Sequence, residues 1–153
     1  MLKYKTEIKG DVFMNILYKT TAVSTGGRDG KVIVNNSELE FDMALPTELG
    51  GTKKTGVNPE QLFAAGYSAC FGSALQHVVR ARKLHIPTPS IQTTVGIGSN
   101  DLGGFTLSVE IIATLSGIDQ VLADEVVKEA HTVCPYSNAT KGNIEVSVTA
   151  KIK

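Results

Sequence analysis

The sequence has no excess of either charge and no long apolar run. Its 153 residues contain 15 Lys and Arg against 15 Asp and Glu, so the formal net charge is zero. Without a polybasic or polyacidic tract, neither nucleic acid nor an anionic membrane is an expected partner. No apolar run approaches the ~20 residues of a membrane span, and the opening MLKYKTEIKG is too charged for a secretory signal. These absences predict a cytoplasmic protein that does not insert into a membrane and acts on a small or neutral partner.

Motifs for nucleotides and metals are also missing. There is no GxGxxG or Walker sequence, so we interpret the glycine clusters as turns. His131 and Cys134 have the i, i+3 spacing of metal ligands, but no CxxC or HExxH accompanies them, and tetrahedral zinc needs more ligands. A Cys-His hydrolase is not favoured either, because His77 lies ~10 Å beyond Cys70 along the same predicted helix. We expect no bound cofactor and no metal.

Cysteine is scarce, since Cys70 and Cys134 are the only 2 thiols in the chain. Two is the smallest number that allows one thiolate to be oxidised and a second to resolve it as a disulfide. In the cytoplasm such a disulfide is more often transient, and catalytic or redox-sensing, than permanent. Free cysteines are also common as small buried hydrophobic residues. The count alone leaves both interpretations open.

Alternating and β-branched segments predict strands that are separated by clusters of turn residues. They cover residues 16–24, 31–35, 38–43, 91–98, 105–115 and 143–152. A long helix from 58 to 82 or 83 and a second helix over 118–133 fall between them. The order β-β-β-α-β-β-α-β predicts one domain over residues 1–153 with an α+β fold, in which antiparallel sheets pack around a long central helix.

The central helix is predicted to start at Asn58, an N-cap residue followed by proline and by an acidic side chain that suits the helix dipole. Its apolar positions cover more than one face, so we expect most of it, including Cys70, to be buried or nearly so. Gly66 and Gly72 each cost about 1 kcal/mol relative to alanine inside a helix. They indicate that another backbone packs closely there or that the helix bends.

Cys134 is predicted to lie at a junction between two helices. Pro135 disfavours helical geometry at Cys134 but suits the first position of a short helix over 135–141. Cys134 is then the N-cap, where a thiolate would face backbone N–H groups and where the backbone can move to complete a bond.

Cys70 requires a neighbouring group that stabilises its thiolate. With an ordinary pKa of about 8.5, only ~3% of a cysteine is ionised at pH 7. The helix dipole does not reach a residue so far inside the helix, and burial raises the pKa of a thiol. A fixed cation is therefore required, and Arg28 is the candidate because it sits in a glycine-flanked loop at the end of a strand. The alternative is that Arg28 is an exposed turn residue.

Glu60 is a candidate to orient a buried Arg28 through a bidentate pair, or it serves only as the acidic charge of the helix start. On a straight helix Glu60 and Cys70 lie ~15 Å apart along the axis. Both reach one arginine only if its side chain spans that gap or the helix breaks near Gly66.

Three long motifs resemble a known family. TTAVSTGGRDG, NPEQLFAAGYSACFGSAL and HTVCPYSNATKGN resemble the signature stretches of the organic hydroperoxide resistance proteins (Ohr), which belong to the OsmC-like superfamily. The resemblance covers residues 14–153. Residues 1–13 have no counterpart in the pattern and are a possible N-terminal extension.

The resemblance implies a thiol peroxidase that reduces organic and fatty-acid hydroperoxides to alcohols. Cys70 would be the peroxidatic thiolate and Cys134 the resolving thiol. Arg28 would activate Cys70 and assist the leaving oxygen, and Glu60 would hold Arg28. The external reductant would be a dihydrolipoyl group, on a lipoylated protein or as dihydrolipoamide. The family also implies an intertwined homodimer with its active sites at the interface.

An apolar substrate pocket is expected near the site. Its candidate lining residues are Phe63, Phe71, Leu45 and Tyr136. Two other functions remain open: an OsmC-like peroxidase with a different peroxide preference, and a noncatalytic thiol redox sensor whose disulfide reports oxidation to a partner.

Overall fold

The structure, a computed structural model, describes residues 15–52 and 55–153. Its elements are β1 (Ala22–Thr25), β2 (Lys31–Val34), β3 (Glu40–Asp42), α1 (Pro59–Ala81), β4 (Ser90–Ser99), β5 (Phe105–Leu115), α2 (Gln120–Val133), α3 (Pro135–Thr140) and β6 (Glu145–Ile152). The predicted α+β class and element order are confirmed, including the short third helix. Residues 1–13, the possible extension, lie outside the described part of the chain.

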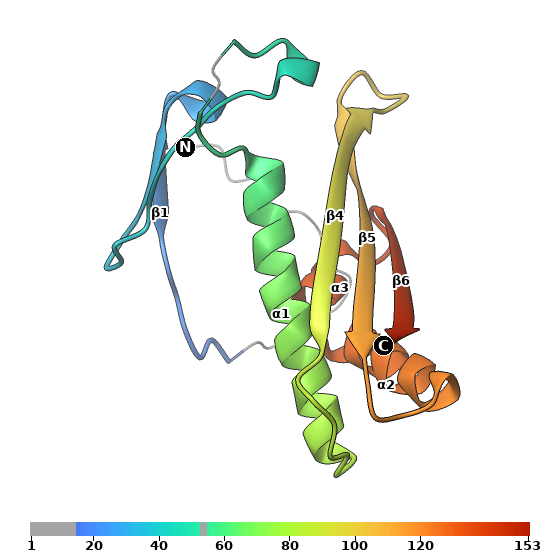
Figure 1. Cartoon of the computed structure of the whole chain (residues 1–153). Coiled ribbons are helices and arrows are strands. Elements are labelled where there is room, and N and C mark those ends of the chain that lie inside the picture. The colour runs from blue at the N-terminus through green and yellow to red at the C-terminus, as the bar shows by residue number, and fades with distance from the viewer. Residues whose placement is uncertain (1–14, 53–54) are drawn as a thin grey trace.

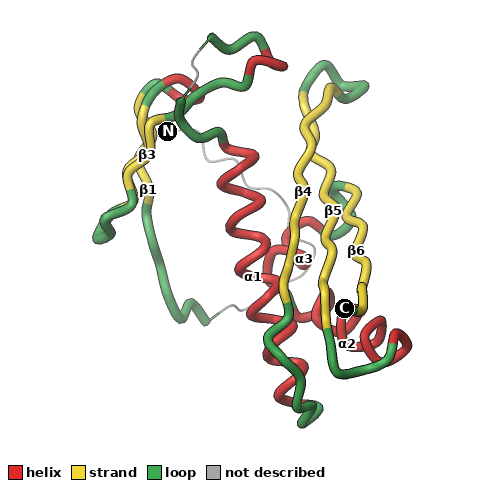
Figure 2. The backbone as a smooth tube through the Cα atoms, in the orientation of Figure 1, coloured by secondary structure: helices red, strands yellow, loops and turns green. Residues whose placement is uncertain are grey.

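The strands form two separate sheets with the long helix between them. One sheet has the order β1-β2-β3 and the other the order β4-β5-β6. Figures 1 and 2 show α1 crossing the molecule, with β4 along one side of it and the β1-β2-β3 sheet on the other. α1 packs against β4 and α2, and α2 also packs against β6. The long helix is therefore central, as predicted.

The second sheet contains a parallel pair in addition to the predicted antiparallel pairing. β4 and β5 form an antiparallel hairpin, whereas β6 pairs with β5 in parallel, from Ser108 opposite Glu145 to Leu115 opposite Ile152. α2 and α3 carry the chain back to the end of the sheet where β5 began. A crossover of this kind places the next strand parallel to the previous one.

The first strand is shorter than predicted. β1 begins at Ala22, not at residue 16. β2 provides only four residues for pairing before the chain turns at Asn36, whose φ is 56°. The last contact of the ladder runs from the Asn35 N–H to the carbonyl of Thr21 at 2.8 Å. Residues before Thr21 therefore have no position opposite them in β2, and β propensity alone does not make them a strand.

α1 starts where its sequence predicts and ends one residue before the predicted range of 82 to 83. The Asn58 side chain accepts a hydrogen bond from the Gln61 N–H at 2.8 Å, and the Gln61 side chain accepts one from the Asn58 N–H at 2.9 Å. This reciprocal capping box satisfies two N–H groups that the first turn would leave without partners. The helix ends at Ala81, with Arg82 as its C-cap.

One face of α1 supplies the centre of the core. Its fully buried large side chains recur at helical spacing and are Tyr67, Phe71, Leu75 and Val78. The opposite face, with Ala65, Ala69 and Ser73, is exposed, and Cys70 lies at the margin as a half-buried residue. The expected enclosure of most of the helix is therefore wrong for a single chain, because nothing in the described chain covers this second face.

The core is built from α1, α2, β5 and β6, with partly buried side chains of β4 packed against it, and no residue of β1, β2 or β3 belongs to it. Val23 and Ile33, on those strands, are 53% and 44% exposed.

Among residues 15–52 and 55–153, no helix has the length and apolar composition that crossing a bilayer requires.

Candidate functional site

The two thiols face each other across a helix contact. Cys70 lies in the middle of α1, and Cys134 lies between α2 and α3. Their Sγ atoms are 3.6 Å apart, with the Cys134 thiol donating toward Cys70, and both cysteines are free. A disulfide needs sulfurs about 2.05 Å apart, so an approach of roughly 1.5 Å would complete the bond. Residues 64 positions apart in sequence are thus placed for direct reaction.

Cys134 occupies the predicted helix junction. It is the C-cap of α2 and the N-cap of α3, with φ −66° and ψ 122°, and Pro135 is the first residue of α3. Its N–H donates to the Ala130 carbonyl at 2.9 Å, and its own carbonyl accepts from the Asn138 N–H at 3.0 Å. Its side chain is fully buried. The backbone at Cys134 is held on both sides, so the expected freedom to move is not found there.

Burial raises the pKa of the Cys70 thiol, and the backbone N–H of Tyr136 partly opposes this effect. The neighbouring Cys134 thiol also raises the pKa of Cys70. A thiolate is stabilised by a donor that points at it and destabilised by removal from water. The N–H groups at the start of α3 were expected to face Cys134, but one of them acts on Cys70. Sequence adjacency could not reveal this, because it depends on how α3 packs against α1.

Arg28 forms the bidentate pair with Glu60 that the sequence suggested. Nη1 donates to Oε2 at 2.8 Å and Nη2 donates to Oε1 at 2.6 Å. Arg28 lies in a 3-10 turn, Gly27–Asp29, between β1 and β2, whereas Glu60 lies in the first turn of α1. The guanidinium lowers the pKa of the Glu60 carboxyl, which is 11% exposed. The turn is tight, because a Cβ on Gly30 would lie 1.7 Å from the Thr25 carbonyl oxygen.

The structure does not bring Arg28 to Cys70. In the single chain the neighbours that shift the pKa of Cys70 are Cys134 and the Tyr136 backbone, whereas Arg28 is paired with Glu60 in the first turn of α1. α1 continues through Gly66 without a break, so Glu60 and Cys70 are ~15 Å apart along its axis. The Gly66 position is instead covered by an aromatic side chain, since a Cβ there would lie 3.0 Å from the Tyr136 hydroxyl oxygen.

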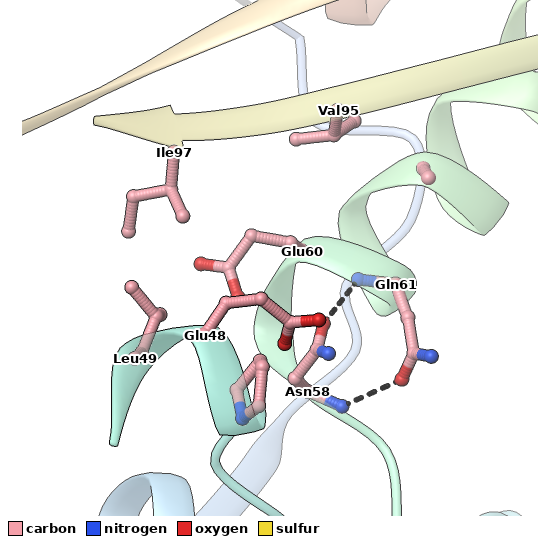
Figure 3. Close-up of a pocket in the computed structure, with 9 residues that line it drawn as sticks. Glu48, Leu49, Asn58, Glu60, Gln61, Val95 and Ile97 are labelled. Atoms are coloured by element: carbon pink, nitrogen blue, oxygen red, sulfur yellow. Dashed lines mark hydrogen bonds between the residues drawn. The ribbon is translucent and has the colours of Figure 1, made fainter. Parts of the chain in front are cut away.

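A cavity of about 390 Å³ lies beside Glu60 (Figure 3). It is bounded by the 3-10 turn Thr47–Leu49, the first turns of α1 and the middle of β4. Its lining residues are Pro46, Glu48, Leu49, Asn58, Glu60, Gln61, Ala64, Val95 and Ile97. Figure 3 shows Val95, Ile97 and Leu49 around the space in which the Glu60 carboxylate lies. The cavity therefore combines an aliphatic wall with two carboxylates and two amides, and its aliphatic part suits an apolar group of a small ligand.

The four expected pocket residues do not line this cavity. Phe71 is fully buried in the core, with its ring centroid 6.4 Å from that of His131 on α2. Phe63 and Tyr136 pack with Tyr67 as an aromatic cluster, with ring centroids 5.5 to 5.9 Å apart. Val95 and Ile97 were missed, although their alternation in β4 marks one sheet face. The sequence alone does not say which strand lies along the start of α1.

The fold and the facing thiols define an α+β protein with a two-cysteine site on a central helix, and comparison with known proteins makes this class specific. The model of the family described as OsmC-like protein matches residues 51–149. An organic hydroperoxide resistance protein of Xanthomonas axonopodis pv. citri is 46% identical over 135 residues, which are 88% of this chain and 94% of the relative. The organic hydroperoxide resistance protein OhrB of Bacillus subtilis is 39% identical over 139 residues, covering 88% and 98%.

Solved structures agree with these relatives. The crystal structure of an organic hydroperoxide resistance protein from Elizabethkingia anophelis matches with a TM-score of 0.88 and 46% identity, over 92% of this chain and 100% of that one. The OhrB structure from Bacillus subtilis matches with a TM-score of 0.81 and 38% identity, over 89% and 100%. The chain therefore belongs to the OsmC-like family and, within it, to the organic hydroperoxide resistance proteins.

Proposed function

We propose that the protein is a thiol-dependent peroxidase that reduces organic and fatty-acid hydroperoxides to alcohols. The observation that carries the proposal is the 3.6 Å approach of the Cys70 and Cys134 sulfurs in a member of this family. The cavity beside Glu60, which Cys70 does not line, has an aliphatic wall of Leu49, Val95 and Ile97 that favours an alkyl chain over water.

The chemistry proceeds in three balanced steps. The Cys70 thiolate attacks the outer peroxide oxygen, the O–O bond breaks, and the alkoxide takes a proton to leave as the alcohol, while Cys70 becomes a sulfenic acid. The Cys134 thiol then attacks the Cys70 sulfur, a disulfide forms and water leaves. A dihydrolipoyl dithiol, on a lipoylated protein or as dihydrolipoamide, reduces the disulfide and is itself oxidised to the cyclic disulfide.

Arg28 and Glu60 are proposed to serve the first step. A guanidinium beside the sulfur would favour the thiolate and the departing alkoxide together. Within one chain Arg28 is bound to Glu60 in the first turn of α1, so it acts on Cys70 only by a shift toward the middle of the helix or, in a homodimer, from the second chain. Tyr136 contributes its backbone N–H to the same sulfur without any movement.

We also propose that the protein acts as an intertwined homodimer in the cytoplasm. The β1-β2-β3 sheet contributes nothing to the core of its own chain, and the face of α1 with Ala65, Ala69 and Ser73 is open. Small side chains on such a face permit close approach of a second helix. Light scattering should give twice the mass of the chain, and a monomeric mass at micromolar concentration would contradict this assembly.

Turnover tests the proposed activity. With dihydrolipoamide present, the protein should consume many equivalents of an alkyl hydroperoxide and react more slowly with hydrogen peroxide. Cys70→Ser should abolish consumption without unfolding the protein, because the side chain is only half-buried. Consumption of a single equivalent would instead favour the redox-sensor function. A preference for hydrogen peroxide would favour an OsmC-like peroxidase of different specificity.

A further inference from the structure

A buried polar network lies next to the two cysteines. The Tyr67 hydroxyl donates to Ser137 Oγ at 2.9 Å and lies 3.4 Å from Thr140 Oγ1, where either oxygen can donate. Tyr67 is 0% exposed, and Ser137 and Thr140 are 3% and 8% exposed. Ser137 and Thr140 are the buried polar residues within residues 15–52 and 55–153. A buried hydroxyl is costly without a partner, so Tyr67 on α1 satisfies groups that belong to α3.

The hydrogen bond and the thiol pair join the same two segments at matching positions. Tyr67 lies three residues before Cys70 on α1, and Ser137 lies three residues after Cys134 on α3. The two links therefore run side by side between antiparallel segments, ~4.5 Å apart along the axis of α1. The position of Ser137 consequently fixes the position of Cys134 relative to Cys70.

α3 depends on such contacts for its place. It has only six residues, Pro135–Thr140, and helices this short are not stable on their own. It carries both groups that act on Cys70: the Cys134 thiol at its N-cap and the Tyr136 N–H in its first turn. Besides these groups, α3 contacts α1 through Tyr136, which packs against Gly66 and the neighbouring aromatic rings.

We propose that Tyr67 is a positioning residue for disulfide formation: its bond to Ser137 holds α3 so that Cys134 faces the Cys70 sulfur. The role in turnover rests on the proposed peroxidase function. The attacking sulfur must lie in line with the bond that breaks, and small losses of alignment are expensive. Loss of one hydrogen bond of typical strength should slow ring closure about 5- to 10-fold.

The test measures how fast Cys134 closes on Cys70. In Tyr67→Phe, one equivalent of an alkyl hydroperoxide should oxidise Cys70, but a larger share of its sulfenic acid should be captured by dimedone before the disulfide forms. Thr93→Val is the matched control, because it removes a buried hydroxyl on β4 that has no hydrogen-bond partner in the part of the chain that the structure describes. In Thr93→Val, the share of Cys70 sulfenic acid that dimedone captures should equal that of the parent.

A second readout does not require peroxide chemistry. Oxidised glutathione forms a mixed disulfide with Cys70, and Cys134 then displaces glutathione thiolate to close the same bond. Tyr67→Phe should slow this displacement as well. If the parent fails to reduce peroxides yet shows the Tyr67 effect with glutathione, the proposed function falls and the positioning role stands.

Other outcomes would overturn the inference. If Tyr67→Phe melts earlier but closes the disulfide at the parent rate in both assays, Tyr67 is merely structural. Should Tyr67→Phe fail to fold, Ser137→Ala removes the 2.9 Å bond from the other side and leaves the Tyr67 hydroxyl 3.4 Å from Thr140 Oγ1. It should slow closure by the same factor as Tyr67→Phe or by a smaller one, and parent-like closure in Ser137→Ala would refute the role of the Tyr67–Ser137 bond. Adding Ser137→Ala to Tyr67→Phe should slow closure no further, because the Tyr67 hydroxyl is already absent.

Discussion

Oxidation should stabilise the protein strongly, because the bond between Cys70 and Cys134 joins residues 64 positions apart. Closing a loop of about 65 residues removes roughly 14 cal/mol/K of entropy from the unfolded chain, or about 4 kcal/mol at 25 °C. Strain in the folded state reduces this value. The strain should be small, because the sulfurs already lie 3.6 Å apart and need little displacement of either helix. For a domain of this size, each kcal/mol raises Tm by about 2–4 °C, so a rise of about 10 °C is expected.

The assay compares reduced protein with protein treated with one equivalent of an alkyl hydroperoxide. Intact mass identifies the disulfide by the loss of two hydrogens, and thermal unfolding is followed by circular dichroism. Cys134→Ser is the matched control, since its Cys70 can form a sulfenic acid but no internal disulfide. Its Tm should not show the rise of about 10 °C.

Two results would refute this reasoning. If the parent forms the internal disulfide and its Tm is unchanged or lower, the bond strains the fold by as much as it restricts the unfolded chain. If oxidation gives a disulfide between chains instead, the facing arrangement of Cys70 and Cys134 is wrong. An equal rise in Cys134→Ser would show that the stabilisation does not come from loop closure.

Two further predictions concern the Arg28–Glu60 pair. Arg28→Ala should slow the oxidation of Cys70 about 10-fold or more without unfolding the protein, and an unchanged rate in rapid-mixing experiments would remove Arg28 from the mechanism. Glu60→Gln should lower the free energy of unfolding by about 1 kcal/mol at pH 7, because one partner is largely buried and the other is partly screened by water. Since Arg28 lowers the pKa of Glu60 in the folded state, the pair stabilises the fold above the ordinary carboxyl pKa. This contribution is lost as the pH falls through the lowered pKa, so urea titrations should find the gap between parent and variant closing in acid, and a pH-independent gap would contradict the linkage.

Local chemistry made several features predictable from sequence. The N-cap at Asn58 and the helix junction at Cys134 follow from residues within a few positions, so the structure reproduces them. The pairing of Arg28 with Glu60 was predicted because a guanidinium held at the site needs a carboxylate partner, although the Arg28 side chain stays partly exposed in the single chain. The order of elements followed from hydrophobic periodicity and from turn residues.

Features that depend on packing between distant segments were not predictable. The parallel pairing of β6 with β5 depends on the direction in which α2 and α3 return the chain. The N–H of Tyr136 acts on Cys70 because α3 packs against α1. The sequence of α3 alone does not predict this packing. Phe71 was a candidate for lining an apolar pocket, yet its side chain is buried in the core. The sequence left open whether Glu60 and Cys70 both reach Arg28, because only the structure shows that α1 runs through Gly66 without a break.

The backbone of Cys134 has a consequence for repeated use of the site. Its N–H completes the last turn of α2 and its carbonyl accepts the first bond of α3, so neither helix has to unwind when the thiol reacts. Rotation about side-chain bonds then carries most of the sulfur's motion. The oxidised and reduced forms should share one backbone fold and nearly the same far-ultraviolet circular dichroism spectrum. No refolding step would be needed between catalytic cycles. Inactivation during turnover would then come from over-oxidation of Cys70 to sulfinic acid and not from unfolding.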